Sequence, residues 1–170
     1  MATPSDKFLK ALIQPGDILL YDRKGWVNKL IKFKRGEKYS HAAIASYPGY
    51  MLEAVQGKMC DEYPLRLDGL AAIYRHREDE VDFELGYEWF QQEARGQKYD
   101  WLGLLSFSFA QFQGRENNKM FCSEFVARFF AKISAPLFST VTDADAVSPG
   151  MIPYSPRVYS IWIRADKRKS

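Results

Sequence analysis

Cysteine and histidine are both scarce in this chain of 170 residues, which contains two of each. Two cysteines do not make a disulfide framework, although a single bridge between Cys60 and Cys122 stays compatible with the sequence. Neither a CxxC nor an HxxxH pair occurs, and the four residues lie far apart in the chain. We therefore expect no metal site and no cofactor.

Several motifs of common functional sites are also absent. Neither GxxxxGK followed by Ser or Thr nor GxGxxG occurs, which argues against nucleotide-dependent chemistry. GxSxG is missing too, so a serine hydrolase of the nucleophile-elbow type has no support. The net charge is only +3, and the basic residues gather in two short segments, 24–38 and 164–170. We expect no nucleic-acid binding, because it usually requires a concentrated basic face.

The sequence has no long hydrophobic run. Its longest nearly apolar stretch, WLGLLSFSFAQF at 101–112, is too short to span a bilayer and contains Ser and Gln. The first residues lack the basic region and apolar core of a secretory signal. We expect a soluble cytoplasmic protein with one domain at 1–170, a core from about 14 to 165 and a basic tail at 166–170. Release by cell lysis or delivery within a phage particle stays a possible route out of the cytoplasm.

Apolar residues make up 46% of the chain, and their spacing predicts its secondary structure. Helical spacing predicts helices at 5–13, 26–33, 80–95, 99–112 and 122–133, and alternation predicts strands at 16–22, 40–46, 50–56, 70–76 and 157–165. Pro48-Gly49 predicts a hairpin turn, 113–120 is expected to be a loop, and 139–156 is expected to be rich in turns. This order predicts an α+β protein with an antiparallel sheet packed against helices, including the helix that carries a cysteine.

Cys122 begins the segment with the clearest helical pattern. Apolar residues recur there at 122, 125, 126, 129, 130 and 133, which places the cysteine on the core side at the first turn. Two interpretations stay open. Cys122 is a small buried hydrophobic residue, the common fate of a free cysteine, or it is a nucleophile whose thiolate is stabilised by the N-terminus of the helix.

A nucleophilic cysteine needs a base, and the two histidines differ in their surroundings. His76 lies between two arginines in YRHRED, and we expect it to be exposed at the surface. His41 lies in SHAAIAS, where alternation places it on one strand face with two alanines that leave room for a helix. It is either a base or a core histidine bonded to the backbone. Glu53, in the next strand, is either its buried carboxylate partner or an outward-facing charge on an edge strand.

Five motifs together resemble a known superfamily: PGDILLYD, YSHAAIA, MLEAV, GQKYDW and MFCSEFVARFF. They resemble the NlpC/P60 superfamily of papain-like cysteine hydrolases. The order of the motifs is similar to the circularly permuted branch, the YiiX/YebB-like proteins, because the histidine strand precedes the cysteine helix. The resemblance spans roughly residues 14–165.

The resemblance implies a permuted papain-like fold and a set of functional residues. Cys122 would be the nucleophile, His41 the base and Glu53 the residue that orients the imidazole. Tyr99, in GQKYD, corresponds to the tyrosine upstream of the cysteine that helps form the oxyanion site, although its spacing from the cysteine is longer here. The implied substrate-binding residues, of which the last two lie in a late SP-containing loop, are Ser40, Ser123, Ser148 and Pro149.

The implied substrate is a peptide, as in peptidoglycan-type amide bonds, or an acyl ester. A lipid acyl hydrolase or acyltransferase of the same fold is an alternative, as is a non-catalytic module that binds acyl chains or glycopeptides. The basic segment 26–33 is either a core-packed helix with solvated lysines or a helix that associates weakly with an anionic membrane or the cell wall. The sequence does not indicate an oligomeric state.

Overall fold

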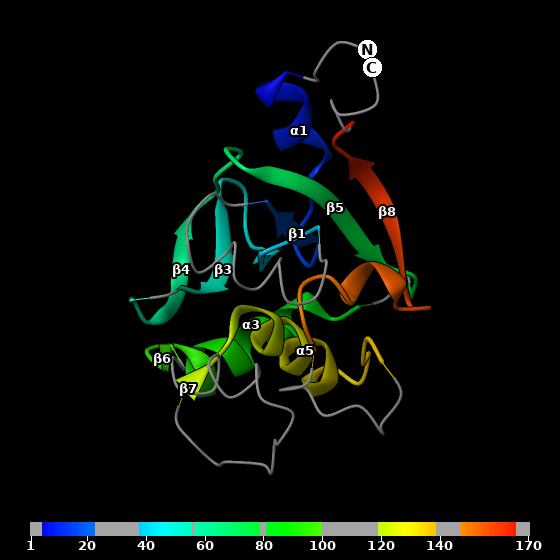
Figure 1. Cartoon of the computed structure of the whole chain (residues 1–170). Coiled ribbons are helices and arrows are strands. Elements are labelled where there is room, and N and C mark those ends of the chain that lie inside the picture. The colour runs from blue at the N-terminus through cyan, green and yellow to red at the C-terminus, as the bar shows by residue number, and fades with distance from the viewer. Residues whose placement is uncertain are drawn as a thin grey trace.

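The computed structural model describes residues 5–22, 38–55, 57–78, 81–99, 119–138 and 147–165. A central antiparallel sheet has the strand order β4-β3-β2-β1-β5-β8 (Figure 1). Its strands are β1 (Ile18–Tyr21), β2 (His41–Ala45), β3 (Tyr50–Ala54), β4 (Cys60–Pro64), β5 (Leu70–His76) and β8 (Val158–Ile163). The described α-helices are α1 (Asp6–Leu12), α3 (Phe83–Trp89) and α5 (Cys122–Lys132). A short parallel pair, β6 (Lys98–Tyr99) and β7 (Lys119–Met120), forms a second sheet, which the bridge between Met59 and Lys98 joins to the start of β4.

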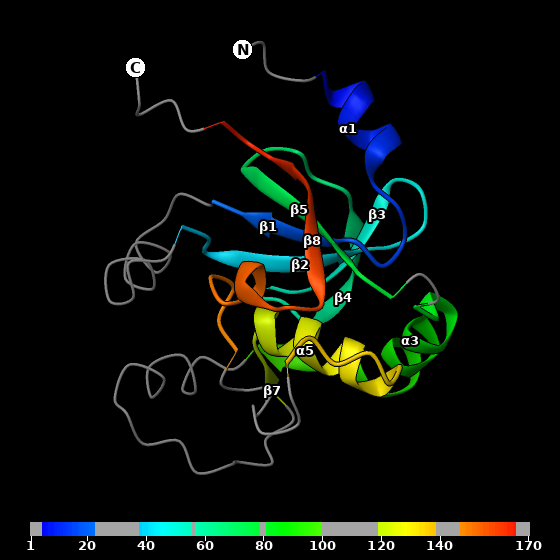
Figure 2. The ribbon, with the colours of Figure 1, turned by 90° about the vertical axis from the view of Figure 1, so that its right-hand side faces the viewer.

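The sheet lies between helices on its two faces. Figures 1 and 2 show α1 on one side of the sheet and α3 with α5 on the other. Strand alternation explains this arrangement, since successive side chains point to opposite faces. In β2, Ala42 and Ile44 pack in one core cluster with Phe125 of α5, whereas Ala43 and Ala45 pack in a second cluster with the helix α1.

The predicted α+β organisation with an antiparallel sheet is confirmed. The predicted helices at 5–13, 80–95 and 122–133 and all five predicted strands are present, and 80–95 ends in a π-helical turn at Phe90–Ala94. The described part of the turn-rich segment 139–156 contains one short 3-10 helix, Ile152–Tyr154.

Two elements differ from the prediction. The segment 60–64 is a strand that alternation did not identify, because its centre is Asp61-Glu62, and residues 119–120 of the expected loop are the strand β7. The predicted helix at 26–33, most of that at 99–112 and the tail at 166–170 lie outside the described residues. Of the helices that the structure describes, none has the length and apolar character needed to cross a bilayer.

The helix α5 follows the apolar stripe that predicted it, and every position of that stripe is buried. Its first turn is capped by Glu124, whose side chain accepts a hydrogen bond from the backbone N–H of Phe121 at 3.1 Å. The helix ends where Ser134 takes a positive φ of 59° and the N–H of Ala135 donates to the carbonyl oxygen of Phe130 at 2.9 Å. The sequence therefore fixes Cys122 as the first residue of a buried helix.

The hairpin between β2 and β3 brings two distant residues onto one face. Gly49 adopts a φ of 90°, as the predicted Pro-Gly turn requires, and Ala45 pairs with Met51. Continuing this register places Glu53 opposite the residue two positions after His41. The two side chains are thus diagonal neighbours on the same face of the sheet.

Candidate active site

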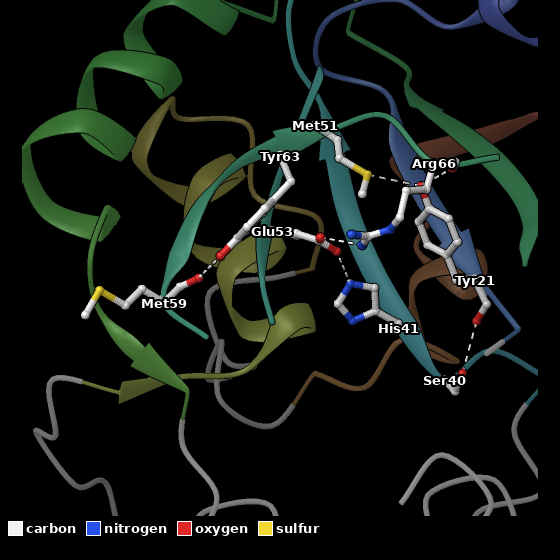
Figure 3. A network of polar contacts seen from close by, with 8 residues as sticks. All are labelled: Tyr21, Ser40, His41, Met51, Glu53, Met59, Tyr63 and Arg66. Atoms are coloured by element: carbon white, nitrogen blue, oxygen red, sulfur yellow. Dashed lines mark hydrogen bonds and ion pairs between the residues drawn. The ribbon is translucent and has the colours of Figure 1, made fainter. Parts of the chain in front are cut away.

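His41 and Glu53 form a buried contact across the β2–β3 hairpin. The Nε2 atom of His41 lies 2.6 Å from Oε2 of Glu53 (Figure 3). The glutamate is fully buried and His41 is only 5% exposed. A carboxylate at this depth needs hydrogen-bond partners, so the interpretation of Glu53 as an outward-facing charge is wrong. Of the predicted catalytic residues, the structure brings these two together.

The other carboxylate oxygen of Glu53 accepts a hydrogen bond from the Arg66 guanidinium. Arg66 lies between β4 and β5, and the Tyr21 hydroxyl donates to its backbone carbonyl oxygen at 2.9 Å. The Tyr21 ring also stands beside the His41 ring, with 5.9 Å between the ring centroids. Arg66 was not predicted from the sequence, because the residue lies outside any periodic segment and its partner comes from another strand.

Cys122 is the first residue of α5 and is 5% exposed. The helix packs against both β2 and β3. Its apolar stripe contacts the face of β2 that carries Ala42 and Ile44, whereas His41 lies on the face with Tyr21. The expectation that the alanines beside His41 admit a helix is therefore wrong for α5. This helix packs on Ala42, which points to the face of β2 opposite to His41. Cys122 and His41 each stand at the start of their element.

The two cysteines are both thiols, so the bridge that the sequence left open is absent. Cys60 begins β4 and is almost fully buried. Burial raises the pKa of the Cys60 thiol to about 12, and the charges of Asp61 and Glu53 act in the same direction. Cys60 is thus held in the protonated, unreactive form.

The backbone of Tyr99 lies beside the residues that lead into the cysteine helix. In the parallel β6–β7 pair, Tyr99 pairs with Met120, two residues before Cys122. This places the predicted oxyanion residue beside the start of α5 at the level of the main chain.

The predicted substrate-binding residues lie in the first turn of α5, just before β2, and in the loop after Val147. The Ser123 hydroxyl donates to the carbonyl oxygen of Val147 at 2.6 Å, which anchors the loop with Ser148 and Pro149 to the first turn of α5. Ser40 precedes His41, and its backbone N–H donates to the carbonyl oxygen of Tyr21 at 2.9 Å. Ser40, Ser123 and Ser148 are all buried. Their contacts make Ser40 and Ser123 parts of the framework, and their role toward substrate stays a prediction.

His76 is not the surface residue that its charged neighbours indicated. It is 4% exposed, and its ring stacks on Phe130 of α5 with 5.5 Å between the ring centroids. The backbone N–H of Glu78 donates to Nδ1 at 3.2 Å, while the buried Nε2 has no partner. The prediction failed because the neighbouring Arg75 points to the other face of β5, where it binds Asp17. His76 lies apart from the His41–Glu53 contact and takes no part in it.

Neither a protein-family model nor a curated protein matches this chain. Within the described ranges, no three His, Cys, Asp or Glu side chains are grouped in a way that would hold a metal ion.

Proposed function

We propose that this protein is a cysteine hydrolase that cleaves an amide or an acyl ester through a thioacyl-enzyme. Cys122 is the nucleophile, His41 the base and Glu53 the carboxylate that orients the imidazole. The observation that carries the proposal is the buried 2.6 Å contact between His41 and Glu53. It lies on the two strands against which the cysteine helix packs. A buried histidine whose second nitrogen is directed by a carboxylate is the usual companion of a catalytic thiol.

The contact assigns different tasks to the two ring nitrogens. Nε2 of His41 donates to Glu53, so Nδ1 is the atom that takes the proton of the Cys122 thiol. The thiolate attacks the substrate carbonyl carbon, and the imidazolium then protonates the leaving amine or alcohol. Water attacks the thioester with His41 as base, which releases the carboxylic acid and restores the thiol.

The oxyanion is stabilised by groups at the N-terminus of α5. The backbone N–H of Cys122, in the first turn of this helix, is the proposed main-chain donor. Tyr99 is the second proposed donor to the same oxygen, because its backbone pairs with Met120, two residues before Cys122. The helix dipole adds a favourable potential for both the thiolate and the oxyanion.

The two faces of the sheet constrain how the thiol meets the imidazole. The stripe of α5 packs on the face of β2 that carries Ala42 and Ile44, so the proposal requires the thiol to reach the imidazole around the first residue of β2 and not through the sheet. Both Cys122 and His41 begin their elements, and the loop that follows Val147 is tied to the same end of α5. A substrate would bind at this end of the molecule.

Thiol alkylation tests the proposed ion pair. We expect iodoacetamide to modify Cys122 rapidly at pH 5–7, well below about 8.5, the ordinary pKa of a thiol. Cys60 is the internal control, because its raised pKa keeps it protonated over the same range. The His41→Gln variant should return Cys122 to the pH dependence of an ordinary thiol. Equal rates for the two cysteines between pH 5 and pH 9 in the wild type would exclude the ion pair.

A substrate screen tests the reaction itself. Peptidoglycan-type peptides, acyl esters and lipid acyl esters should be offered in parallel, with Cys60→Ala as the matched control for Cys122→Ala. We expect Cys122→Ala to abolish hydrolysis and Cys60→Ala to retain it, because only the first removes the nucleophile. A chain that binds these compounds but has an inert Cys122 thiol would instead be the non-catalytic module.

A further inference from the structure

Glu53 is held by two different groups, one on each carboxylate oxygen. Oε2 faces the His41 ring, and Oε1 accepts from a nitrogen of the Arg66 guanidinium. Figure 3 shows the three side chains in sequence, with the Glu53 carboxylate between the imidazole and the guanidinium. Arg66 is 38% exposed at its side chain, whereas Glu53 is completely buried. The charged head of Arg66 therefore reaches inward to an anion that water does not solvate.

The segment that carries Arg66 is fastened to the sheet on both sides of the arginine. The N–H of Leu65 donates to the carbonyl oxygen of Gly49 at 2.8 Å, and the N–H of Asp22 donates to that of Gly69 at 2.9 Å. The hydroxyl of the fully buried Tyr21 holds the carbonyl oxygen of Arg66 itself. These contacts fix the backbone from which the guanidinium reaches Glu53.

We propose that Arg66 is a positioning residue of the candidate site, because it immobilises the Glu53 carboxylate in the orientation that directs the His41 ring. This inference rests on the proposed function only in that His41 is the base. A contact on one carboxylate oxygen restricts rotation of the carboxylate and so narrows the directions from which the other oxygen accepts the imidazole N–H. Removing Arg66 takes away one of the contacts that hold the Glu53 carboxylate, so the tautomer and tilt of the His41 ring become less closely defined.

The charges around the pair determine how Arg66 acts on proton binding. Asp61 of β4 lies opposite Glu53 in the register, and its own carboxylate is paired with Arg95 at 2.9 Å. The pair also has a ring contact with Tyr21 of β1 and electrostatic interactions with Cys60 and Tyr63 of β4. Arg66 partly neutralises Glu53, so its removal makes the His41–Glu53 pair bind a proton more tightly.

The test is the NMR titration of the imidazole rings in the intact protein. The chain has only two histidines, so a His76→Gln sample assigns both signals. We expect Arg66→Gln to raise the apparent pKa of the His41 signal by about one unit. Arg66→Lys, which keeps the charge, should return it toward the wild-type value. Arg95→Gln is the matched control, because it removes a half-exposed arginine from Asp61 without touching Glu53.

The outcomes separate this inference from the proposed function. An unchanged His41 titration in Arg66→Gln, or an equal rise in Arg95→Gln, would overturn the role of Arg66. If Arg66→Gln does not fold, the wild-type guanidinium signals decide: hindered rotation of Arg66 supports the proposal and free rotation contradicts it. None of these readouts needs a reactive thiol. An inert Cys122 with a shifted His41 would therefore refute the hydrolase and leave the positioning role intact.

Discussion

Among single residues, His76 combines full burial with a ring nitrogen that has no partner. Burial lowers the pKa of His76 below its ordinary value of about 6.5; the negative charge of Glu78 opposes this shift, and the positive charge of Arg157 adds to it. The unfolded chain therefore takes up a proton at this residue at a higher pH than the folded protein does. Stability is fully present above pH 6.5 and falls as the pH drops through the lowered pKa.

Replacing His76 with phenylalanine removes both the titration and the unpartnered Nε2 donor. We expect His76→Phe to be more stable by about 1 kcal/mol at pH 7.5, since an unsatisfied buried donor is unfavourable by about that much or more. The difference in the free energy of unfolding should be larger at pH 5, because only the wild type has a buried imidazole at this position and loses stability as the pH falls. Urea denaturation at both pH values measures it, and the titration of His41 cancels because both proteins contain it. A difference that is equal at the two pH values would contradict the role of the buried imidazole.

The predictability of each site residue follows from where its partner lies. The contact of His41 with Glu53 was predictable, because a short hairpin and the two-residue period of strands determine which side chains become neighbours. The burial of His76 was not, because the charges of its neighbours do not reveal that alternate residues face opposite layers. Arg66 was beyond sequence reasoning, since its contact depends on how an irregular segment folds back over β3.

Among the elements, α3 and α5 pack so closely that one position admits no side chain. A Cβ atom on Gly86 of α3 would lie 2.3 Å from a ring atom of Phe129 in α5. Phe129 is fully buried and contacts further aromatic rings, Phe83 and Trp89 among them, so it has little room to move. The glycine is thus required for the close approach of the two helices and not for a turn.

We expect Gly86→Ala to lower the free energy of unfolding by about 2 kcal/mol, because overpacking outweighs the gain in helix propensity of about 1 kcal/mol. The double variant Gly86→Ala/Phe129→Leu should be less destabilised than the sum of the two single changes, since the smaller side chain makes room for the methyl group. Chemical denaturation of the four proteins of this cycle gives the coupling. Strict additivity would show that the ring moves aside freely.

Element prediction succeeded where one face is apolar and failed where both faces are mixed. The apolar stripe of α5 and the largely apolar runs of β2 and β3 are buried, and such segments are recognisable in the sequence. The edge strand β4 carries Asp61 and Glu62 on opposite faces, and it forms because β3 offers it a ladder of hydrogen bonds. Such a strand depends on pairing with its neighbour, and the local sequence does not predict that pairing.

For the whole molecule, β1 is the strand that joins the two halves of the sheet. It pairs with β2 on one edge and with β5 on the other, and α1 precedes it on the sheet face opposite to α5. The buried Asp17 connects these parts. It accepts two hydrogen bonds from Arg75 of β5, at 2.7 and 2.9 Å, and one from the backbone N–H of Gln14 at 2.8 Å.

Breaking this connection should weaken the whole fold without altering the candidate site. We expect Asp17→Asn to lower the free energy of unfolding by about 3 kcal/mol, because it leaves the Arg75 charge largely buried without its anion. Asp17 lies just before β1 begins, whereas Tyr21, which contacts His41, lies at the other end of that strand. The His41 titration and the alkylation rate of folded Cys122 should therefore remain those of the wild type. Urea denaturation, followed by tryptophan fluorescence and circular dichroism, should still show one coincident transition.

A double variant distinguishes the loss of the Asp17–Arg75 ion pair from the destabilising effect of an unpaired Arg75 charge. Asp17→Asn/Arg75→Met removes both charges, and we expect it to recover much of the stability that Asp17→Asn loses. If the double variant is as unstable as the sum of its single changes, the pair is not what joins α1 and β1 to β5. If Asp17→Asn shifts the His41 titration, the two ends of β1 are coupled, and the separation between the fold-bearing ion pair and the candidate site does not hold.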